Sequence, residues 1–316
     1  MPEDRCMTPT PNPPFAGPAA EPGAEPRPAP PAVPLTTPAT APRTAPAGIS
    51  TDASAASAMR SGPGARPVNA RPAGEPILVA SGLTKRYRQV VALADVAITL
   101  HGGSSTAVVG PSGSGKSTLL HCLAGFTRPD AGQVTLDGMA ISQLGQRTAT
   151  RLRRERFGFV FQSDQLLGEL PAVENVALPL MLGGMSRRAA IARASEWFAP
   201  LELNGLESRR PGQLSGGQVQ RVSIARALVV APSVVFADEP TAALDRSTST
   251  TTMQVLTESC RHVGAALLVV THDPDVAAAC DRTVTMRDGR VHEVVTNAST
   301  STTSTTSTTV LTGATR

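Results

Sequence analysis

The chain has 316 residues and a formal net charge of +4, a length that fits one or two domains. Its apolar runs fall short of a membrane span, which needs roughly 18 residues, and no apolar stretch near the start predicts a secretory signal. The four cysteines are too few and too scattered for a disulfide framework or a zinc cluster, so we expect buried, reduced thiols in a cytosolic protein.

Composition separates the two ends of the chain from its middle. Nineteen of the 28 prolines fall in residues 1–76, and the last 20 residues are rich in Ser and Thr. Segments so poor in large apolar side chains cannot bury enough surface to offset their chain entropy. We therefore predict disorder over residues 1–76 and 297–316, and a single folded domain over residues 77–296.

The order of the apolar segments predicts an α/β fold. The expected strands are residues 77–80, 90–100, 106–109, 234–237 and 266–270, with a turn near residues 85–88. A leucine-rich helix follows the third strand and stops at Gly125, and a helix with Met253, Leu256 and Cys260 on one face precedes the last strand. Polar residues follow several of these strands, which predicts a site at the carboxyl edge of the sheet.

Residues from about 157 to 214 interrupt this alternation of strands and helices. Their pattern is mostly helical, above all over residues 187–200. We therefore expect a helical subdomain inserted into the α/β domain.

A glycine-rich segment joins the expected strand at 106–109 to the helix after it. Residues 110–117 read GPSGSGKS and fit the pattern G-x-x-x-x-G-K-[ST]. Glycines let backbone N–H groups wrap a phosphate, and the helix N-terminus adds partial positive charge. Lys116, one of only two lysines in the chain, would reach the β- and γ-phosphates, and the Ser117 hydroxyl would bind Mg²⁺. The segment therefore predicts a nucleoside triphosphate site.

Charged and polar side chains follow two other expected strands. Asp238 comes directly after the apolar run VVFA, as a second Mg²⁺-organising carboxylate would, and Glu239 beside it could polarise the attacking water. His272 ends the neighbouring strand, where it could sense the γ-phosphate. Without a phosphate site, the same residues would be a charged pair capping a strand and an ordinary polar histidine.

The motif LSGGQ at residues 214–218 identifies the family that the sequence resembles. Taken alone, Ser215 and Gln218 form a capping box that opens an amphipathic helix over residues 219–228. Together with the glycine-rich loop, the motif resembles the signature of ATP-binding cassette (ABC) ATPases, and the resemblance covers nearly all of residues 77–296. It implies a P-loop NTPase fold: a RecA-like α/β core with a mixed and parallel sheet, an antiparallel β part and an inserted helical subdomain.

The resemblance also assigns a role to each motif. Tyr87 matches the aromatic residue that stacks on adenine, Gln162 matches the Q-loop and Asp245 the D-loop. The expected catalytic residues are Glu239, His272 and Lys116. The expected Mg²⁺ ligands are Ser117, Gln162 and Asp238. The expected ATP-binding residues are Tyr87, Gly110, Pro111, Ser112, Gly113, Ser114, Gly115, Lys116, Ser117, Thr118, Gln162, Ser215, Gly216, Gly217, Gln218 and Asp245.

The expected partners follow from the same resemblance. In ABC ATPases the signature motif of one subunit faces the γ-phosphate bound by the other, so ATP closes a head-to-tail homodimer and hydrolysis opens it. The dimer would drive a separate integral membrane permease from the cytoplasmic face of the cell membrane. Residues 162–167 and 173–180 are similar to the macrolide-export and lipoprotein-release group, which favours export.

Two other functions remain open on the sequence alone. A division-type ABC ATPase, which transmits force across the membrane without moving a substrate, shares every catalytic residue with a transporter subunit. A soluble ABC ATPase acting on nucleic acid is disfavoured, because the chain has one cassette, about 100 residues between Lys116 and Ser215, and no sustained heptads. We therefore expect no nucleic-acid partner, and interpret the basic run at residues 151–156 as a solvated helix face or a surface near the membrane partner.

Overall fold

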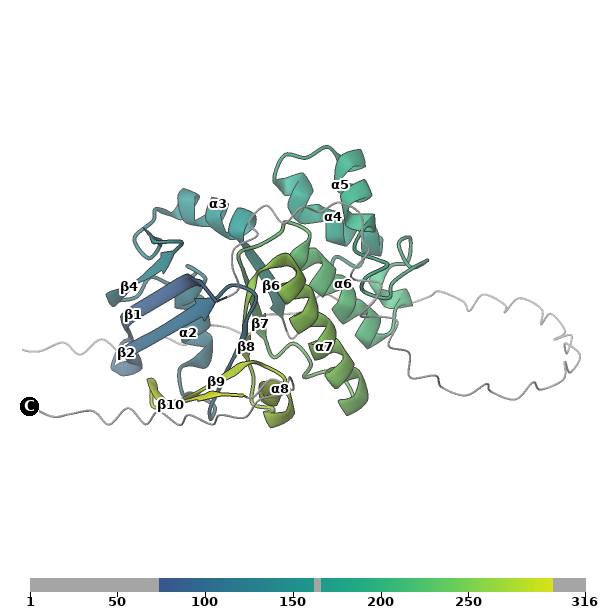
Figure 1. Ribbon diagram of the computed structural model, residues 1–316. Helices are drawn as coiled ribbons and strands as arrows, with labels where there is room; N and C mark the ends of the chain where they lie inside the picture. Colours follow the sequence, from purple (N-terminus) through teal and green to yellow (C-terminus); the bar gives the residue numbers. More distant parts are fainter. Residues whose placement is uncertain (1–73, 162–165, 298–316) are drawn as a thin grey trace, which may run out of the picture. The chain divides into compact units, whose positions relative to one another are not determined.

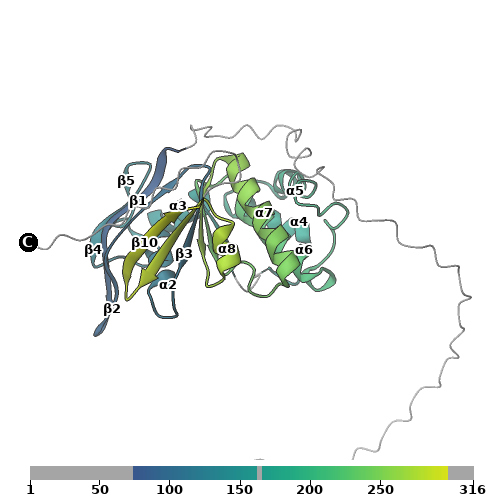
Figure 2. The same ribbon diagram turned by 60° about the horizontal axis from the view of Figure 1, so that its bottom comes forward.

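Two β-sheets and the helices that pack on them make up the described part of the chain (Figures 1 and 2). The computed structural model describes residues 74–161 and 166–297, so our expectations for the remaining residues, Gln162 among them, lie outside the described part. The strands are β1 (Pro76–Tyr87), β2 (Val90–His101), β3 (Ser105–Val109), β4 (Ala131–Leu136), β5 (Met139–Ala140), β6 (Phe157–Phe161), β7 (Val234–Asp238), β8 (Ala266–Val270), β9 (Arg282–Arg287) and β10 (Arg290–Thr296). The helices are α2 (Lys116–Leu123), α3 (Gln146–Arg156), α4 (Ala172–Leu182), α5 (Arg187–Ser195), α6 (Gly216–Leu228), α7 (Arg246–Val263) and α8 (Pro274–Ala278), with a 3₁₀ turn at Pro211–Gln213.

The larger sheet positions the site. Its strand order is β10–β9–β3–β8–β7–β6, and every neighbouring pair is parallel except β10 with β9. The smaller sheet, in the order β2–β1–β4–β5, is antiparallel throughout. The mixed α/β architecture with an antiparallel part, which the resemblance implied, is therefore confirmed.

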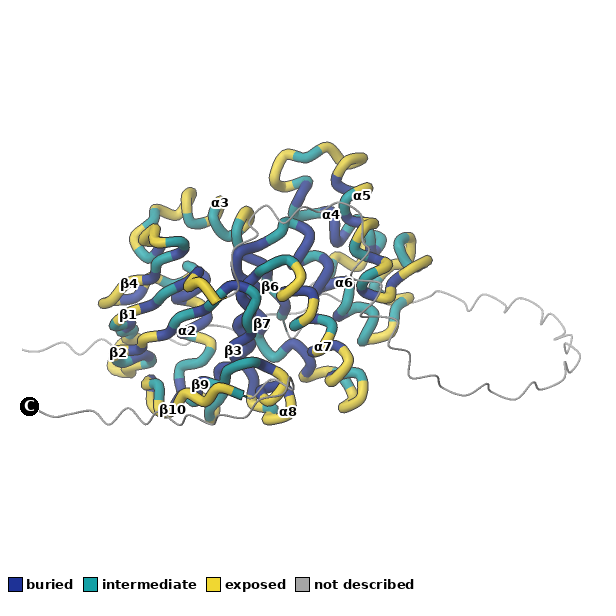
Figure 3. Tube along the Cα trace, viewed as in Figure 1, coloured by how far each residue is buried: buried dark blue, intermediate teal, exposed yellow. Residues whose placement is uncertain are grey.

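Both faces of the larger sheet are buried at its central strands β3, β7 and β8, because these apolar strands alternate their side chains between two cores. Along β3, Ala107 enters the core that includes α6 and α7, while Val108 enters the core that includes α2 and the smaller sheet. Figure 3 shows the central strands largely buried, with the smaller sheet on one side of them and the helices α4 to α7 on the other. The expected strands at 106–109, 234–237 and 266–270 are confirmed as β3, β7 and β8.

The smaller sheet extends further than expected. β1 continues through Tyr87, so most of the turn expected near residues 85–88 belongs to the strand, and the chain reverses after it at Arg88, whose φ is +54°. Ladder pairs continue to the very end of the hairpin, where Tyr87 lies opposite Val90. The hairpin therefore carries Tyr87 on a paired strand rather than on a loop.

The segment that we expected to be helical from about residue 157 begins with a strand, which corrects that boundary. Phe157–Phe161 forms β6 and pairs in parallel with β7, from Phe157 opposite Val234 to Phe161 opposite Asp238. The helices α4 and α5 follow later, and α5 ends at Ser195, before residue 200.

No helix within the described ranges combines the length and the apolar character needed to cross a membrane.

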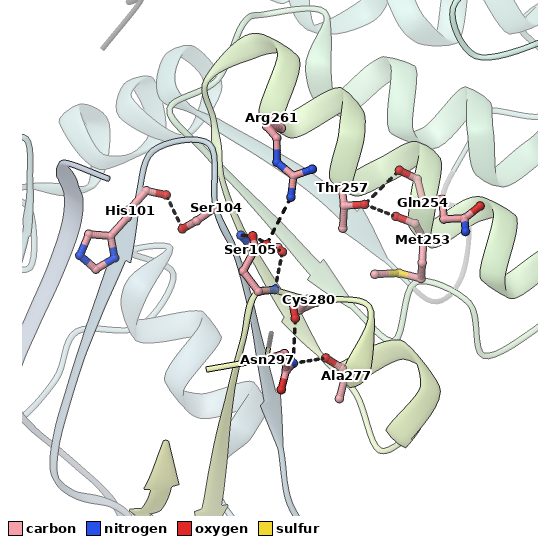
Figure 4. A network of polar contacts seen from close by, with 11 residues as sticks. His101, Ser104, Ser105, Met253, Gln254, Thr257, Arg261, Ala277, Cys280 and Asn297 are labelled. Carbon is pink, nitrogen blue, oxygen red and sulfur yellow. Dashed lines mark hydrogen bonds and ion pairs between the residues drawn. The ribbon is translucent and has the colours of Figure 1, made fainter. Parts of the chain in front are cut away.

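A polar network holds the end of β10 (Figure 4). The Asn297 side-chain amide donates to the carbonyl oxygens of Ala277 at 3.1 Å and Cys280 at 2.7 Å. Its backbone N–H donates to the carbonyl oxygen of Asp281 at 2.9 Å. The Asp281 carboxylate in turn accepts from the backbone N–H and the hydroxyl of Ser105, both at 2.8 Å. Asn297, which we expected to begin the disordered tail, is therefore fixed to the start of β3.

Candidate functional site

The glycine-rich segment runs from the end of β3 into the start of α2 and packs against two other strands, β9 and β2. Gly110 has a φ of +149° and Gly115 a φ of +99°. A Cβ atom would lie 2.2 Å from the carbonyl oxygen of Met286 at Gly110, and 2.3 Å from that of Ala92 at Gly115. Both positions therefore require glycine, for backbone conformation and for space. Residues 110–117, which we call the phosphate loop, are thus packed against β9 and β2.

Donors gather along this loop. The Lys116 ammonium donates to the carbonyl oxygens of Gly110 at 2.8 Å and Pro111 at 2.9 Å. Gly115 caps α2 without a side-chain hydrogen bond, so the N–H groups of the first turn point out of the helix end. The Ser114 hydroxyl is buried, with no hydrogen-bond partner among the described residues. An ammonium group and a helix N-terminus at one loop form a site suited to a chain of phosphates.

Two neighbouring strands bring a carboxylate and a histidine together. β7 ends at Asp238, and the next residue, Glu239, has a φ of +47° and donates its N–H to the Val270 carbonyl oxygen at 2.9 Å. One Glu239 carboxylate oxygen accepts from the Thr271 hydroxyl at 3.1 Å, and the other contacts Nδ1 of His272 at 2.6 Å. The Glu239 side chain is only 19% exposed. Its position is therefore fixed from two sides by the end of β8.

The charges at this edge of the sheet influence one another. Burial raises the pKa of Asp238, and the adjacent Glu239 raises it further, while His121 and Lys116 act in the opposite direction. The Glu239 carboxylate, by its hydrogen bond and its charge, raises the pKa of His272. The neighbouring groups of the protein therefore stabilise the negative charge of Asp238 only in part. This is expected for a carboxylate that binds a cation or a ligand.

The residues present fit a Mg²⁺ ion. Ser117 lies at the start of α2 and Asp238 at the end of β7, and β8 is the one strand between β3 and β7, so both oxygen donors lie at the carboxyl edge of the sheet. Mg²⁺ in phosphate sites is commonly held by one or two protein oxygens together with substrate phosphates and water. A cation there would also offset the raised pKa of Asp238.

The signature segment, residues 214–218, lies apart from the phosphate loop, at the start of α6. The Ser215 hydroxyl accepts from the Gln218 N–H at 3.3 Å and the Gln218 side chain accepts from the Ser215 N–H at 2.9 Å, which confirms the expected capping box. A Cβ at Gly217 would lie 2.7 Å from Cγ2 of Thr248 on α7. The start of α6 therefore rests on the start of α7 in its own chain, with Ser215 exposed to solvent.

Asp245 fixes the start of α7. Its carboxylate accepts from the backbone N–H groups of Ser247 and Thr248, both at 3.1 Å, and from their hydroxyls at 2.7 and 2.6 Å. These hydrogen bonds, that of the Thr248 hydroxyl first, hold the pKa of Asp245 well below its usual range. The expected D-loop aspartate is thus the N-cap of α7.

The expected site residues fall into two groups. The phosphate loop, Asp238, Glu239 and His272 share the carboxyl edge of β3, β7 and β8. The second group is the signature segment at the start of α6 with Asp245 at the start of α7. Tyr87, 46% exposed, lies at the end of β1. A buried residue that we did not single out, Thr271, contacts Glu239; its place directly before His272 at a strand end was the available signal.

Comparison with known proteins identifies the family. The sequence matches the ABC transporter family over residues 93–242. It is 43% identical over 221 residues to the lipoprotein-releasing system ATP-binding protein LolD 2 of Caulobacter vibrioides, covering 69% of this chain and 97% of that protein. It is also 43% identical over 221 residues to the macrolide export ATP-binding/permease protein MacB of Bradyrhizobium diazoefficiens, covering 69% of this chain and 34% of that protein.

A solved structure agrees with these sequence relatives. The fold is similar to a dimeric ATP-binding cassette in a post-hydrolysis state bound to ADP and Pi, with a TM-score of 0.64 and 37% identity. The match covers 71% of this chain and 100% of that one. The chain is therefore an ATPase that belongs to the ATP-binding proteins of ABC transporters, in the macrolide-export and lipoprotein-release group.

Proposed function

We propose that the chain binds MgATP at the glycine-rich loop, hydrolyses it with Glu239 as the base, and thereby drives a separate membrane permease. The observation that carries this proposal is the Glu239 carboxylate, which Thr271 and His272 hold from two sides beside Asp238. A carboxylate fixed in this way can orient a water molecule and accept its proton.

Each residue of the first group has a task in this proposal. Lys116 and the N–H groups of the first turn of α2 bind the phosphates and stabilise the charge that develops on them. Ser117, Asp238 and Gln162 would hold Mg²⁺, which would neutralise phosphate charge. His272, paired with Glu239, responds to the γ-phosphate from the end of β8. Tyr87 stacks on the adenine.

We infer a head-to-tail homodimer from the second group. Ser215 and the N-terminus of α6 are exposed and rest on α7, so they can present donors to a nucleotide bound by another copy. One chain would then hold two half-sites and no complete one. Turnover per chain should therefore rise with protein concentration, whereas full activity in a strictly monomeric preparation would refute the inference.

The permease is proposed from the relatives. One is named as part of a lipoprotein-releasing system, and another carries its own permease in the same chain and is named for macrolide export. By analogy the chain would sit on the cytoplasmic face of the membrane, attached through a permease, and would power export. Nucleic acid is not expected as a partner.

The variant Glu239→Gln tests the catalytic part. It keeps the size of the side chain but removes the base, so we expect ATP binding to persist, the closed dimer to accumulate and hydrolysis to fall by orders of magnitude. Glu258→Gln makes the same change at an exposed position of α7 and should leave turnover unchanged. Near-normal turnover of Glu239→Gln would reassign the base. Replacing Lys116 should weaken nucleotide binding itself.

The partner is tested with the same trapped form. Glu239→Gln with ATP and Mg²⁺ is used to capture proteins from gently solubilised membranes, and we expect a permease with several membrane spans. A partner with few spans that is linked to wall hydrolases would instead support the division-type function. Capture of nucleic acid or ribosomes without a membrane protein would refute the transporter proposal.

A further inference from the structure

The Tyr87 ring has a cation over it. Lys85 precedes Tyr87 by two residues on β1. The Lys85 ammonium lies 5.6 Å from the centroid of the Tyr87 ring. A cation within about 6 Å of an aromatic centroid is attracted by the ring face. Lys85 thus contacts one face of the Tyr87 ring, while Tyr87 as a whole remains half exposed.

Lys85 is itself held firmly. Its ammonium donates to a carboxylate oxygen of Asp130 and to the carbonyl oxygen of Arg128, both at 2.9 Å, and its side chain is only 15% exposed. The second Asp130 oxygen accepts from the backbone N–H of Arg86, the residue between Lys85 and Tyr87, at 2.7 Å. These bonds, that of Lys85 first, lower the pKa of Asp130. Asp130 therefore binds both the side chain and the backbone beside Tyr87.

This contact, which we call the Lys85–Asp130 clamp, joins the hairpin to the helix of the phosphate loop. The Asp130 N–H donates to the Thr84 carbonyl oxygen at 2.8 Å, which anchors it to β1. The chain between α2 and Asp130 folds back on α2, where the N–H of Thr127 donates to the His121 carbonyl oxygen at 3.1 Å. The clamp therefore fixes the position of the Tyr87 hairpin relative to the phosphate loop.

We propose that Lys85 and Asp130 are positioning residues that hold Tyr87 as a platform for the purine base, an inference that rests on the nucleotide site proposed above. An exposed tyrosine at a hairpin end would otherwise lose rotamer and backbone freedom when a base stacks on it. The clamp restricts the Tyr87 side chain and backbone before the base binds, so that binding loses less conformational freedom. It leaves the phosphate contacts of the loop unchanged. Its effect should therefore depend on the base.

The experiment compares ligands with and without a base on the full-length chain. Lys85→Met removes the cation and keeps the aliphatic stem, and we expect the Kd and KM for ATP to rise about three- to tenfold with kcat unchanged. The affinity for inorganic triphosphate, which has no base, should stay the same. Lys85→Arg keeps a cation and should recover most of the ATP affinity.

A matched control removes another cation that is paired with a carboxylate. The Arg187 guanidinium on α5 contacts the Glu174 carboxylate on α4 at 2.6 Å. Arg187→Met should leave the affinity for both ATP and triphosphate unchanged. A parallel loss of ATP and triphosphate binding in Lys85→Met would overturn the proposal, because it would indicate general damage to the site. Unchanged ATP affinity in Lys85→Met would overturn it as well.

Tyr87 offers a direct spectroscopic readout because it is the only tyrosine in the chain. Tyrosine labelled with ¹³C at the ζ carbon of the ring gives one NMR signal from this chain, which should shift on ATP binding. In Lys85→Met we expect the free-state signal to move and the ATP-induced shift to shrink; an identical signal in both forms would contradict the clamp. If Tyr87→Ala leaves ATP affinity unchanged, the stacking role itself fails. If Tyr87→Ala weakens ATP binding and Lys85→Met does not, only the role of the clamp fails.

Discussion

Replacing Gly217 by alanine tests how the signature helix is held within its own chain. The added Cβ would lie 2.7 Å from Cγ2 of Thr248. Thr248 cannot rotate away without losing the hydrogen bond from its hydroxyl to Asp245, at 2.6 Å. Overpacking of this kind costs about 1–3 kcal/mol, while exchanging glycine for alanine in a helix returns up to about 1 kcal/mol. We therefore expect the free energy of unfolding to fall by about 1–2 kcal/mol.

A second substitution isolates the steric term. Thr248→Ser removes the methyl group that Cβ would strike and keeps the hydroxyl that binds Asp245. In a double-mutant cycle the helix-propensity gain cancels, so Gly217→Ala and Thr248→Ser should show a coupling of about 1–3 kcal/mol. Gly216→Ala serves as the control, because its Cβ would lie 3.4 Å from Cδ2 of Leu244, an ordinary contact.

Urea unfolding of the full-length variants measures these quantities. Trp197 is the only tryptophan, so its fluorescence reports unfolding, and far-UV circular dichroism checks that the whole domain is followed. If the two changes are additive within about 0.5 kcal/mol, the contact between α6 and α7 does not restrain Gly217 and the reasoning is refuted. ATPase activity is a separate readout. Activity that stays low after stability is restored would support a second role for Gly217 at the nucleotide of the other subunit.

The contact between Glu239 and His272 and the glycines of the phosphate loop can be tested in the same way. The pKa of His272 is raised by Glu239, so their ion pair is fully present below the ordinary histidine pKa of 6.5 and is lost as pH rises through the raised value. In a histidine NMR titration Glu239→Gln should bring the pKa of His272 back towards its ordinary value, and an unchanged pKa would contradict the pairing. Gly110→Ala should destabilise the fold more than Gly113→Ala: both glycines have positive φ, but only at Gly110 would Cβ meet a backbone carbonyl, that of Met286 at 2.2 Å. Equal urea midpoints would show that backbone strain alone sets the cost.

The parts that local chemistry determines could be predicted from the sequence. The strands β3, β7 and β8 are short apolar runs, as a parallel sheet buried on both faces requires, and polar residues stand at the carboxyl ends of β7 and β8. The capping box of Ser215 and Gln218 depends on residues three apart in one helix, so it too could be predicted and is observed.

Features that depend on distant pairing could not be predicted in this way. The strand at Phe157–Phe161 is defined by its ladder with β7, more than 70 residues later, and its aromatic residues alone do not exclude a helix. The two-sided support of Glu239 depends on Thr271 and His272, which β8 places beside β7. The contact of Gly217 with Thr248 likewise arises only when α6 and α7 pack.

The Thr248 side chain connects the starts of α6 and α7, the two elements of the proposed second half-site. Asp245 caps α7 and binds the Thr248 hydroxyl, and the Thr248 methyl group leaves room for no more than a hydrogen at Gly217. Because the pKa of Asp245 is lowered, its contribution to stability is present above the ordinary aspartate pKa and is lost only as pH falls through the lowered value. The cap is therefore intact at neutral pH, and it keeps the Thr248 methyl group against the start of α6. In the proposed dimer, this packing would let the exposed end of α6 and the D-loop meet the neighbouring subunit together.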